Sequence, residues 1–113
     1  MAKEVDFCGI YSGKKKDKSG IFETFDGFRK DVPLVRACPV NLECRVMQIV
    51  GVGSHKLVIG KIVESYVNED CITDGIPDPM RIDPLIYSPK TQTYHKLGES
   101  VAKAFHIGKI AKG

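Results

Sequence analysis

The sequence has little that would assign a chemistry directly. None of its apolar runs approaches the length of a membrane-spanning helix, so we expect no membrane insertion. Its four cysteines include no C-x-x-C pair, which removes support for a zinc or thioredoxin-like site and favours free thiols. No G-x-S-x-G, H-E-x-x-H or Walker-type loop occurs, and no G-x-G-x-x-G links a strand to a helix. The sequence therefore predicts no catalytic residue and no metal site.

The excess of positive charge is small. The net charge of +3 is carried largely by the run KKKDKS and by the C-terminal tail, and aromatic residues do not interleave with that run. A basic face for nucleic acid is therefore not indicated. A length of 113 residues is expected to form one domain, 1–113. The opening residues MAKE lead straight into charged sequence, so we expect no signal peptide and a cytoplasmic protein.

The most informative stretch is 40–67. It reads VNLECRVMQIV, then GVGSHK, then LVIGKIVESYV. The first run alternates apolar and polar residues, with Leu42 and Cys44 on the apolar side and Glu43 on the other, which is typical of a half-buried strand. The glycines between the runs favour a hairpin turn. This pattern predicts a long antiparallel ribbon with His55 just past the turn.

The remaining elements are shorter. Residues 2–11 fit the end of a helix or a strand equally well, and the three phenylalanines in 20–31 are expected to pack in the core. Residues 84–87 and 93–95 read as two short strands that could pair. Apolar residues at helical spacing predict a helix over 97–107. The sequence thus predicts an α+β fold, mainly antiparallel, with open sheet edges that favour dimerisation.

Five collinear motifs resemble one known family. They are VDFCGIYSG followed by DKS, then PVNLECRV, then GSHKLVIGKIVE, then IDPLIYSP, and finally TYHKLGESVAKAFHIGK. In this order they resemble the flavin reductase-like family with the FMN-binding split-barrel fold, and especially its flavoredoxin branch. The resemblance implies a partial split β-barrel with a C-terminal helix. It covers only the C-terminal half of the family domain, so we expect that the family's opening strands, which supply much of the ribityl and phosphate binding, are missing.

The resemblance also implies a set of cofactor-binding residues. Ser12 and Gly13 match a loop near the cofactor, although a plain helix stop explains them equally well. Lys18 matches a lysine that looks toward the flavin ring, where a cation would stabilise negative charge on the reduced flavin; the alternative is an exposed lysine in a basic loop. His55 matches a histidine at the edge of the isoalloxazine, or is a plain hairpin histidine. Tyr87 matches an aromatic residue that borders the ring by stacking.

In this family FMN sits at a homodimer interface and carries electrons from NAD(P)H or a redox protein to an acceptor. The resemblance therefore implies an FMN-binding electron-transfer protein, with a flavin reductase or oxidoreductase activity left open. One alternative is a truncated, non-catalytic relative that acts as a dimeric structural or interaction module. A different small-ligand module on the same fold is a second, and a nucleic-acid binder a poorly supported third.

Overall fold

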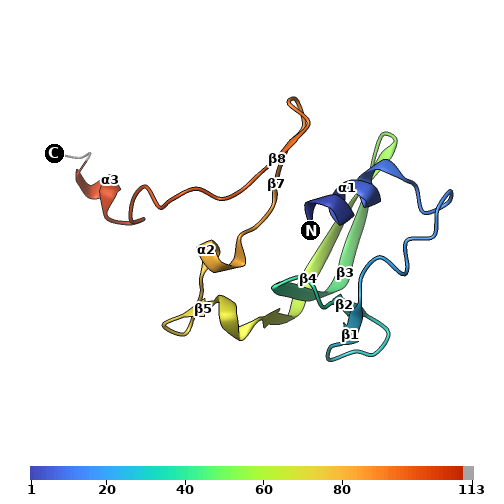
Figure 1. The fold of residues 1–113 in the computed structure, drawn as a ribbon, viewed down its shortest axis with the longest axis horizontal. Helices are drawn as coiled ribbons and strands as arrows, with labels where there is room; N and C mark the ends of the chain where they lie inside the picture. The colour runs from blue at the N-terminus through green and yellow to red at the C-terminus, as the bar shows by residue number, and fades with distance from the viewer. Residues whose placement is uncertain (111–113) are drawn as a thin grey trace. The chain divides into compact units, whose positions relative to one another are not determined.

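The structure, a computed structural model, describes residues 1–110 and divides into two compact units, one of residues 1–82 and one that begins at Asp83. In both units the strands pair antiparallel, two by two, and helices are few (Figure 1). The first unit contains α1 (Ala2–Ile10), β1 (Thr24–Asp26), β2 (Pro33–Val35), β3 (Val40–Val52), β4 (His55–Val67), η1 (Glu69–Cys71), β5 (Ile72–Thr73), β6 (Ile76–Pro77) and α2 (Pro79–Ile82). The second contains β7 (Ile86–Ser88), β8 (Thr93–His95) and α3 (Ile107–Ile110).

The β3–β4 ribbon confirms the predicted hairpin. Each strand has 13 residues, and Val40 pairs with Val67 at one end while Val52 pairs with His55 at the other. The loop between them has two residues, and Gly53 at its first position has φ +58°. A positive φ at that position is what a type II′ hairpin turn requires, and glycine adopts it without a Cβ clash.

Two irregularities interrupt the ribbon. Between the pairs Glu43–Glu64 and Cys44–Ile62 one extra residue lies on β4, and between Val46–Gly60 and Gln48–Ile59 one extra residue lies on β3. The extra residues are Val63 and Met47. Such bulges bend a strand and increase its twist, so this ribbon is curved rather than flat.

The base of the ribbon packs against the β1–β2 pair. The Asn41 side chain accepts a hydrogen bond from the Val35 N–H at 2.9 Å and donates to the carbonyls of Val35 and Cys38 at 3.0 and 3.2 Å. Leu34 on β2 is 4% exposed. These contacts fix the first residues of β3 to β2 and form the small core of the first unit.

Side-chain burial along β3 differs from the predicted alternation. Cys44, expected to be a buried hydrophobe, is exposed, and Leu42 beside it is half exposed. Glu43, expected on the polar side, is 1% exposed. The reason is that β1 and β2 cover the side of β3 that carries Asn41 and Glu43. The expectation that Phe28 packs in the core is also wrong, because its ring is 79% exposed.

A compact run of turns follows the ribbon. Asp74 and Gly75 join β5 to β6 with φ values of +53° and +77°, which suits the type I′ turn that Asp-Gly sequences favour. The buried Cys71 is tied to α2 by a contact from its Sγ to the Arg81 carbonyl at 3.4 Å.

The second unit confirms one expectation and corrects another. β7 and β8 pair antiparallel, as expected of the two short strands. The helix predicted over 97–107 does not form, and α3 is a single short turn at its far end. Val101 and Phe105 are 93% and 91% exposed. A helix of this length depends on burial of its apolar stripe, and here the stripe has no cover.

The barrel that the resemblance implied is not closed within residues 1–110. Their strands form four separate two-stranded sheets, β1–β2, β3–β4, β5–β6 and β7–β8. Closure needs every strand to pair on both sides. The described chain therefore supplies strands of such a fold but leaves their outer edges open.

Candidate functional site

The loop after α1 holds three of the predicted site residues. The Ser12 carbonyl accepts hydrogen bonds from the N–H groups of Lys15 and Lys16, both at 3.0 Å, and its Oγ accepts from the Lys14 N–H at 3.2 Å. Gly13 is exposed and has open space where a Cβ would stand. Ser12 thus organises the loop. The N–H groups of Lys14, Lys15 and Lys16 are thus engaged within the loop, and the lysine amines offer further donors to an anion.

Lys18 closes this loop onto α1. Its Nζ donates a hydrogen bond to the Cys8 carbonyl at 2.8 Å. A cation at this place satisfies an orphan carbonyl of the last helical turn and opposes the negative end of the helix dipole. The same amine has two further protons, so the contact to Cys8 does not prevent it from donating to a ligand.

Two further contacts hold the loop, one from the Asp17 carboxylate and one between Lys16 and the Tyr11 ring. The Ser19 N–H donates to Asp17 Oδ1 at 2.9 Å, and this hydrogen bond lowers the pKa of the Asp17 carboxyl below its ordinary value of 3.8. The Lys16 Nζ lies 4.5 Å from the centroid of the Tyr11 ring, within cation–π range. The loop therefore has a defined local structure with exposed amines on it.

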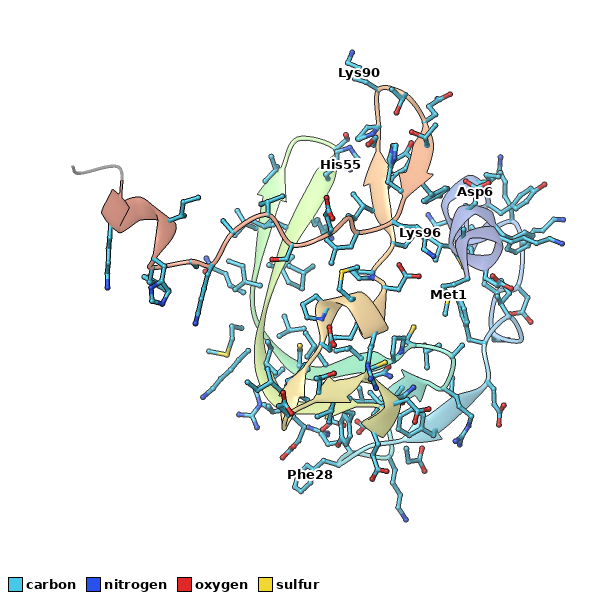
Figure 2. All side chains as sticks on the ribbon, turned by 60° about the vertical axis from the view of Figure 1, so that its left-hand side comes forward. Met1, Asp6, Phe28, His55, Lys90 and Lys96 are labelled. Carbon is cyan, nitrogen blue, oxygen red and sulfur yellow. The ribbon has the colours of Figure 1, made fainter. Side chains whose placement is uncertain are left out.

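His55 lies at the opposite end of the ribbon from the β1–β2 pair. Its side chain is exposed at the hairpin turn, where Figure 2 shows it at the tip of the two strands. It makes no side-chain hydrogen bond or ion pair within residues 1–110. Both ring nitrogens are thus free to donate to or accept from a ligand.

Tyr87 belongs to the second unit. It stands opposite Tyr94 in the β7–β8 pair, with ring centroids 5.2 Å apart and planes tilted by 37°. Tyr87 is 53% exposed, so part of its side chain is available for stacking. The structure brings Ser12, Gly13 and Lys18 into one loop. His55 and Tyr87 each lie on a separate hairpin.

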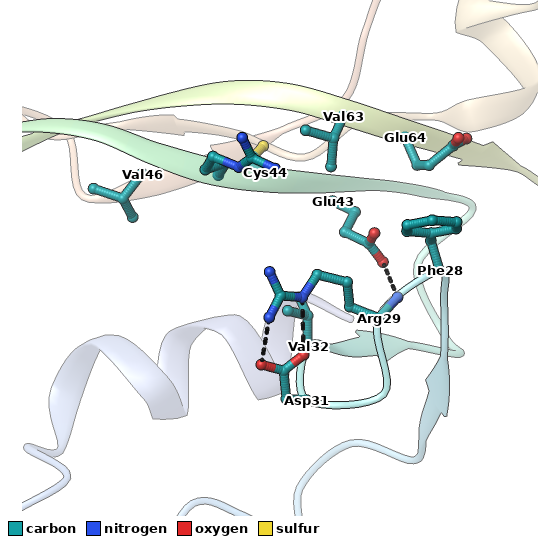
Figure 3. A pocket seen from close by; sticks show the side chains of 10 residues that line it. Phe28, Arg29, Asp31, Val32, Glu43, Cys44, Val46, Val63 and Glu64 are labelled. Carbon is teal, nitrogen blue, oxygen red and sulfur yellow. Dashed lines mark hydrogen bonds and ion pairs between the residues drawn. The ribbon is translucent and has the colours of Figure 1, made fainter.

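The sequence reading missed a second cluster, at the base of the ribbon. Glu43 is 1% exposed, and its Oε1 accepts the Arg29 N–H at 3.5 Å, while its Oε2 has no hydrogen-bond partner within residues 1–110 (Figure 3). A Cβ at Gly27 would lie 2.5 Å from Glu43 Oε1, so only glycine permits this approach. The one available signal was the glutamate in LEC, which the alternation had assigned to the solvent side.

Residues 1–110 contain neither a metal-binding cluster nor a membrane-spanning helix. No group of three or more His, Cys, Asp or Glu side chains is arranged to hold a metal ion. No helix there is both long enough and apolar enough to cross a membrane.

Comparison with known proteins decides the family. The sequence profile of the flavin reductase-like domain matches residues 1–97. The chain belongs to the flavin reductase-like family. A protein of Archaeoglobus fulgidus is 34% identical over 80 residues, covering 69% of this chain and 45% of that protein. A protein of Deinococcus radiodurans is 38% identical over 49 residues, covering 43% of this chain and 22% of that protein.

Two solved flavoredoxins share the fold of this family member. The flavoredoxin from Methanosarcina acetivorans has a TM-score of 0.92 and 36% identity, covering 98% of this chain and 60% of that one. The flavoredoxin of Desulfovibrio vulgaris (Miyazaki F) has a TM-score of 0.82 and 35% identity, covering 94% and 58%. The chain thus spans less than two thirds of each flavoredoxin and less than half of each relative named above.

Proposed function

We propose that this chain is part of a flavoredoxin-like protein that binds FMN and transfers electrons through it. The observation that carries the proposal is the likeness to two flavoredoxins at 35–36% identity over nearly the whole of this chain. In such a protein the flavin supplies the redox chemistry, and the polypeptide supplies position and polarity. NAD(P)H or a redox protein would be the electron donor.

The residues of this chain fit the chemistry of a flavin mononucleotide. Lys18 and its loop offer cations for negative charge on the ring or phosphate, with Ser12 and Gly13 shaping the backbone there. His55 offers a free imidazole to the polar edge of the isoalloxazine, and Tyr87 offers a half-exposed ring for stacking. We propose that these five residues contact the cofactor.

We expect this chain by itself to hold FMN weakly. Phosphate binding draws on backbone N–H groups in a preformed cradle. In the loop at Ser12 the N–H groups of Lys14, Lys15 and Lys16 are already hydrogen-bonded within the loop. Each charge-assisted hydrogen bond missing from the cradle removes about 1.5–3 kcal/mol, or at least about tenfold in affinity.

Titration of FMN, followed by quenching of its fluorescence, tests the proposal. We expect binding that weakens on the order of tenfold in His55→Ala and in Tyr87→Ala, with a changed flavin spectrum. His106→Ala is the matched control, because it removes an exposed histidine outside the proposed site. Unchanged affinity and spectrum in both site variants would contradict the placement. No binding at any concentration would contradict the function.

We further propose that the active form is a homodimer in the cytoplasm. The support is the ribbon, where Ile49 and Leu57 are more than half exposed and both outer edges lack a partner strand within the described chain. Light scattering at micromolar concentration should give the mass of two chains. A stable monomer would contradict the dimer.

A dimeric structural or interaction module without flavin is the second candidate. The exposed apolar ribbon favours it, since such surfaces mark contacts with other polypeptides. The purified protein distinguishes the two functions at once. A yellow protein with flavin absorbance supports the first, and a colourless protein that still forms a defined assembly supports the second.

A further inference from the structure

A cavity of about 500 Å³ lies within the first unit, between the base of the β3–β4 ribbon and the loop that joins β1 to β2. Glu43 and Glu64 line it, and the two residues are directly opposite each other across the strands. Like charges in that position repel. Figure 3 shows the Glu43 carboxylate directed from the ribbon toward the loop of Phe28 and Arg29.

Glu43 forms no ion pair with any residue in the part of the chain that the structure describes. Burial of an ionised carboxylate costs several kcal/mol unless it is paired and hydrogen-bonded. Its Oε1 has one long hydrogen bond, its Oε2 has none within residues 1–110, and the residue is 1% exposed. The site is therefore built around a buried carboxyl group whose second oxygen has no hydrogen-bond partner within the described chain.

The cations that line the cavity do not supply the missing charge. Arg29 is engaged by Asp31 through two hydrogen bonds of 3.1 Å, from its Nε and from one terminal nitrogen, and this contact lowers the pKa of the Asp31 carboxyl. Arg45 also lines the cavity but makes no ion pair with Glu43. The remaining walls include the apolar side chains of Val46 and Val63.

We propose that this cavity receives an arginine or lysine side chain of a polypeptide segment that packs on the base of the ribbon. The cationic nitrogen binds the Glu43 carboxylate, Glu64 adds a second acceptor at the rim, and the valines contact the aliphatic stem. Glu43 Oε2 is enclosed. Entry of the nitrogen therefore requires the exposed loop at Phe28 to shift.

The segment is the part of a flavoredoxin-type domain that this chain does not span. The chain matches 98% of its own length to only 60% of the Methanosarcina acetivorans flavoredoxin, at a TM-score of 0.92. The described strands therefore have the shape they take inside a larger domain, while their outer edges lack partners. A small amine would fill the cavity and leave those edges open, whereas a polypeptide satisfies both.

The test uses this chain and, as the probe, a polypeptide with the part of the Methanosarcina acetivorans flavoredoxin outside the matched 60%. Calorimetry in flavin-free buffer should show a one-to-one complex. Glu43→Gln should weaken it at least tenfold, as expected for loss of one charge-assisted hydrogen bond. Glu69→Gln is the matched control, because Glu69 is exposed and does not line the cavity, and it should leave the affinity unchanged. The inference rests on the proposed flavoredoxin-like function, but because no flavin is present, its failure can be told apart from a failure of FMN binding.

A second set of variants keeps the test decisive if Glu43→Gln does not fold. Each arginine and lysine of the probe is changed to glutamine, and one of these changes should reproduce the tenfold loss with the wild-type chain. That change should cause no further loss with Glu43→Gln, as a double-mutant cycle requires of a direct pair. The proposal is overturned by absence of a complex, by equal binding of Glu43→Gln, or by a probe in which no single basic residue matters. The chain alone could also show the mass of two copies. If Glu43→Gln abolishes that dimer, the cavity binds a second copy instead, and the proposal is overturned.

Discussion

The two ends of the β3–β4 ribbon differ in what surrounds them, although the same pair of strands forms both. At the base, Asn41 and Glu43 lie beneath β2 and the Gly27 loop, with side-chain hydrogen bonds to both. Toward the tip, consecutive cross-strand pairs Ile49–Val58 and Val50–Leu57 point to opposite faces, and Ile49 is 58% exposed. Strand pairing alone thus defines the ribbon, whereas a core forms only where a third element covers it.

The largest expected effect is the difference in unfolding free energy between truncating an apolar side chain at the base and truncating one at the tip. Leu34→Ala removes a buried side chain from the small core and should lower the free energy of unfolding by about 2–5 kcal/mol. Ile49→Ala, at the exposed end, should change it by less than about 0.5 kcal/mol at protein concentrations below those at which the proposed dimer forms. Urea denaturation followed by circular dichroism measures both. Equal losses would mean that the tip is buried in solution.

Gly27→Ala tests the close packing of the base. The new Cβ would lie 2.5 Å from Glu43 Oε1, 2.8 Å from Leu34 Cδ1 and 2.9 Å from the Tyr66 hydroxyl oxygen, so these groups must move. Overpacking of this kind should cost about 1–3 kcal/mol in unfolding free energy. Gly20→Ala is the control, since nothing lies within 4 Å of its Cβ position. A neutral Gly27→Ala would show that the base is loosely packed.

Tyr66→Phe removes one hydrogen bond from the same region. The Tyr66 hydroxyl oxygen accepts the Phe28 N–H at 2.8 Å and so holds the Gly27 loop on the ribbon. The change should cost about 0.5–1.5 kcal/mol in unfolding free energy. Hydrogen exchange at the Phe28 amide should also accelerate, and unchanged exchange there would argue against this bond.

The smallest expected effect is an increase in the free energy of unfolding, whereas the changes above lower it. Glu64→Gln removes the like charge that faces Glu43 across the strands and should raise the free energy of unfolding by about 0.2–1 kcal/mol. The gain should shrink at high salt, because Glu64 is exposed and its field is screened. A loss of stability instead would mean that Glu64 already has a favourable partner in the folded chain.

The sequence predicted local pairing well and burial poorly. The runs on either side of Gly53, and the short strands around Tyr87 and Tyr94, were identified because β-prone residues and turn residues act over a few positions. The helix over 97–107 was wrong, because an apolar stripe predicts a helix only when something buries it. Glu43 was assigned to solvent because alternation does not say which face a neighbouring strand covers.

The candidate site was predicted only in part. Lys18 could be singled out by its motif, but its contact with the Cys8 carbonyl depends on how the loop folds back, which no short pattern encodes. The cavity at Glu43 could not have been found, since it joins residues from segments that are distant in the sequence. A single sequence does not predict which distant segments come into contact.

The extra residues Val63 and Met47 each change which face of the ribbon the following side chains point to. Each adds one residue to one strand only, so the inside-outside assignment that holds at Asn41 cannot be carried by counting to Ile49. The base and the tip can therefore vary independently in which face is apolar. Deleting Met47 would restore a regular alternation along β3 and force the β3 side chains beyond it onto the opposite faces.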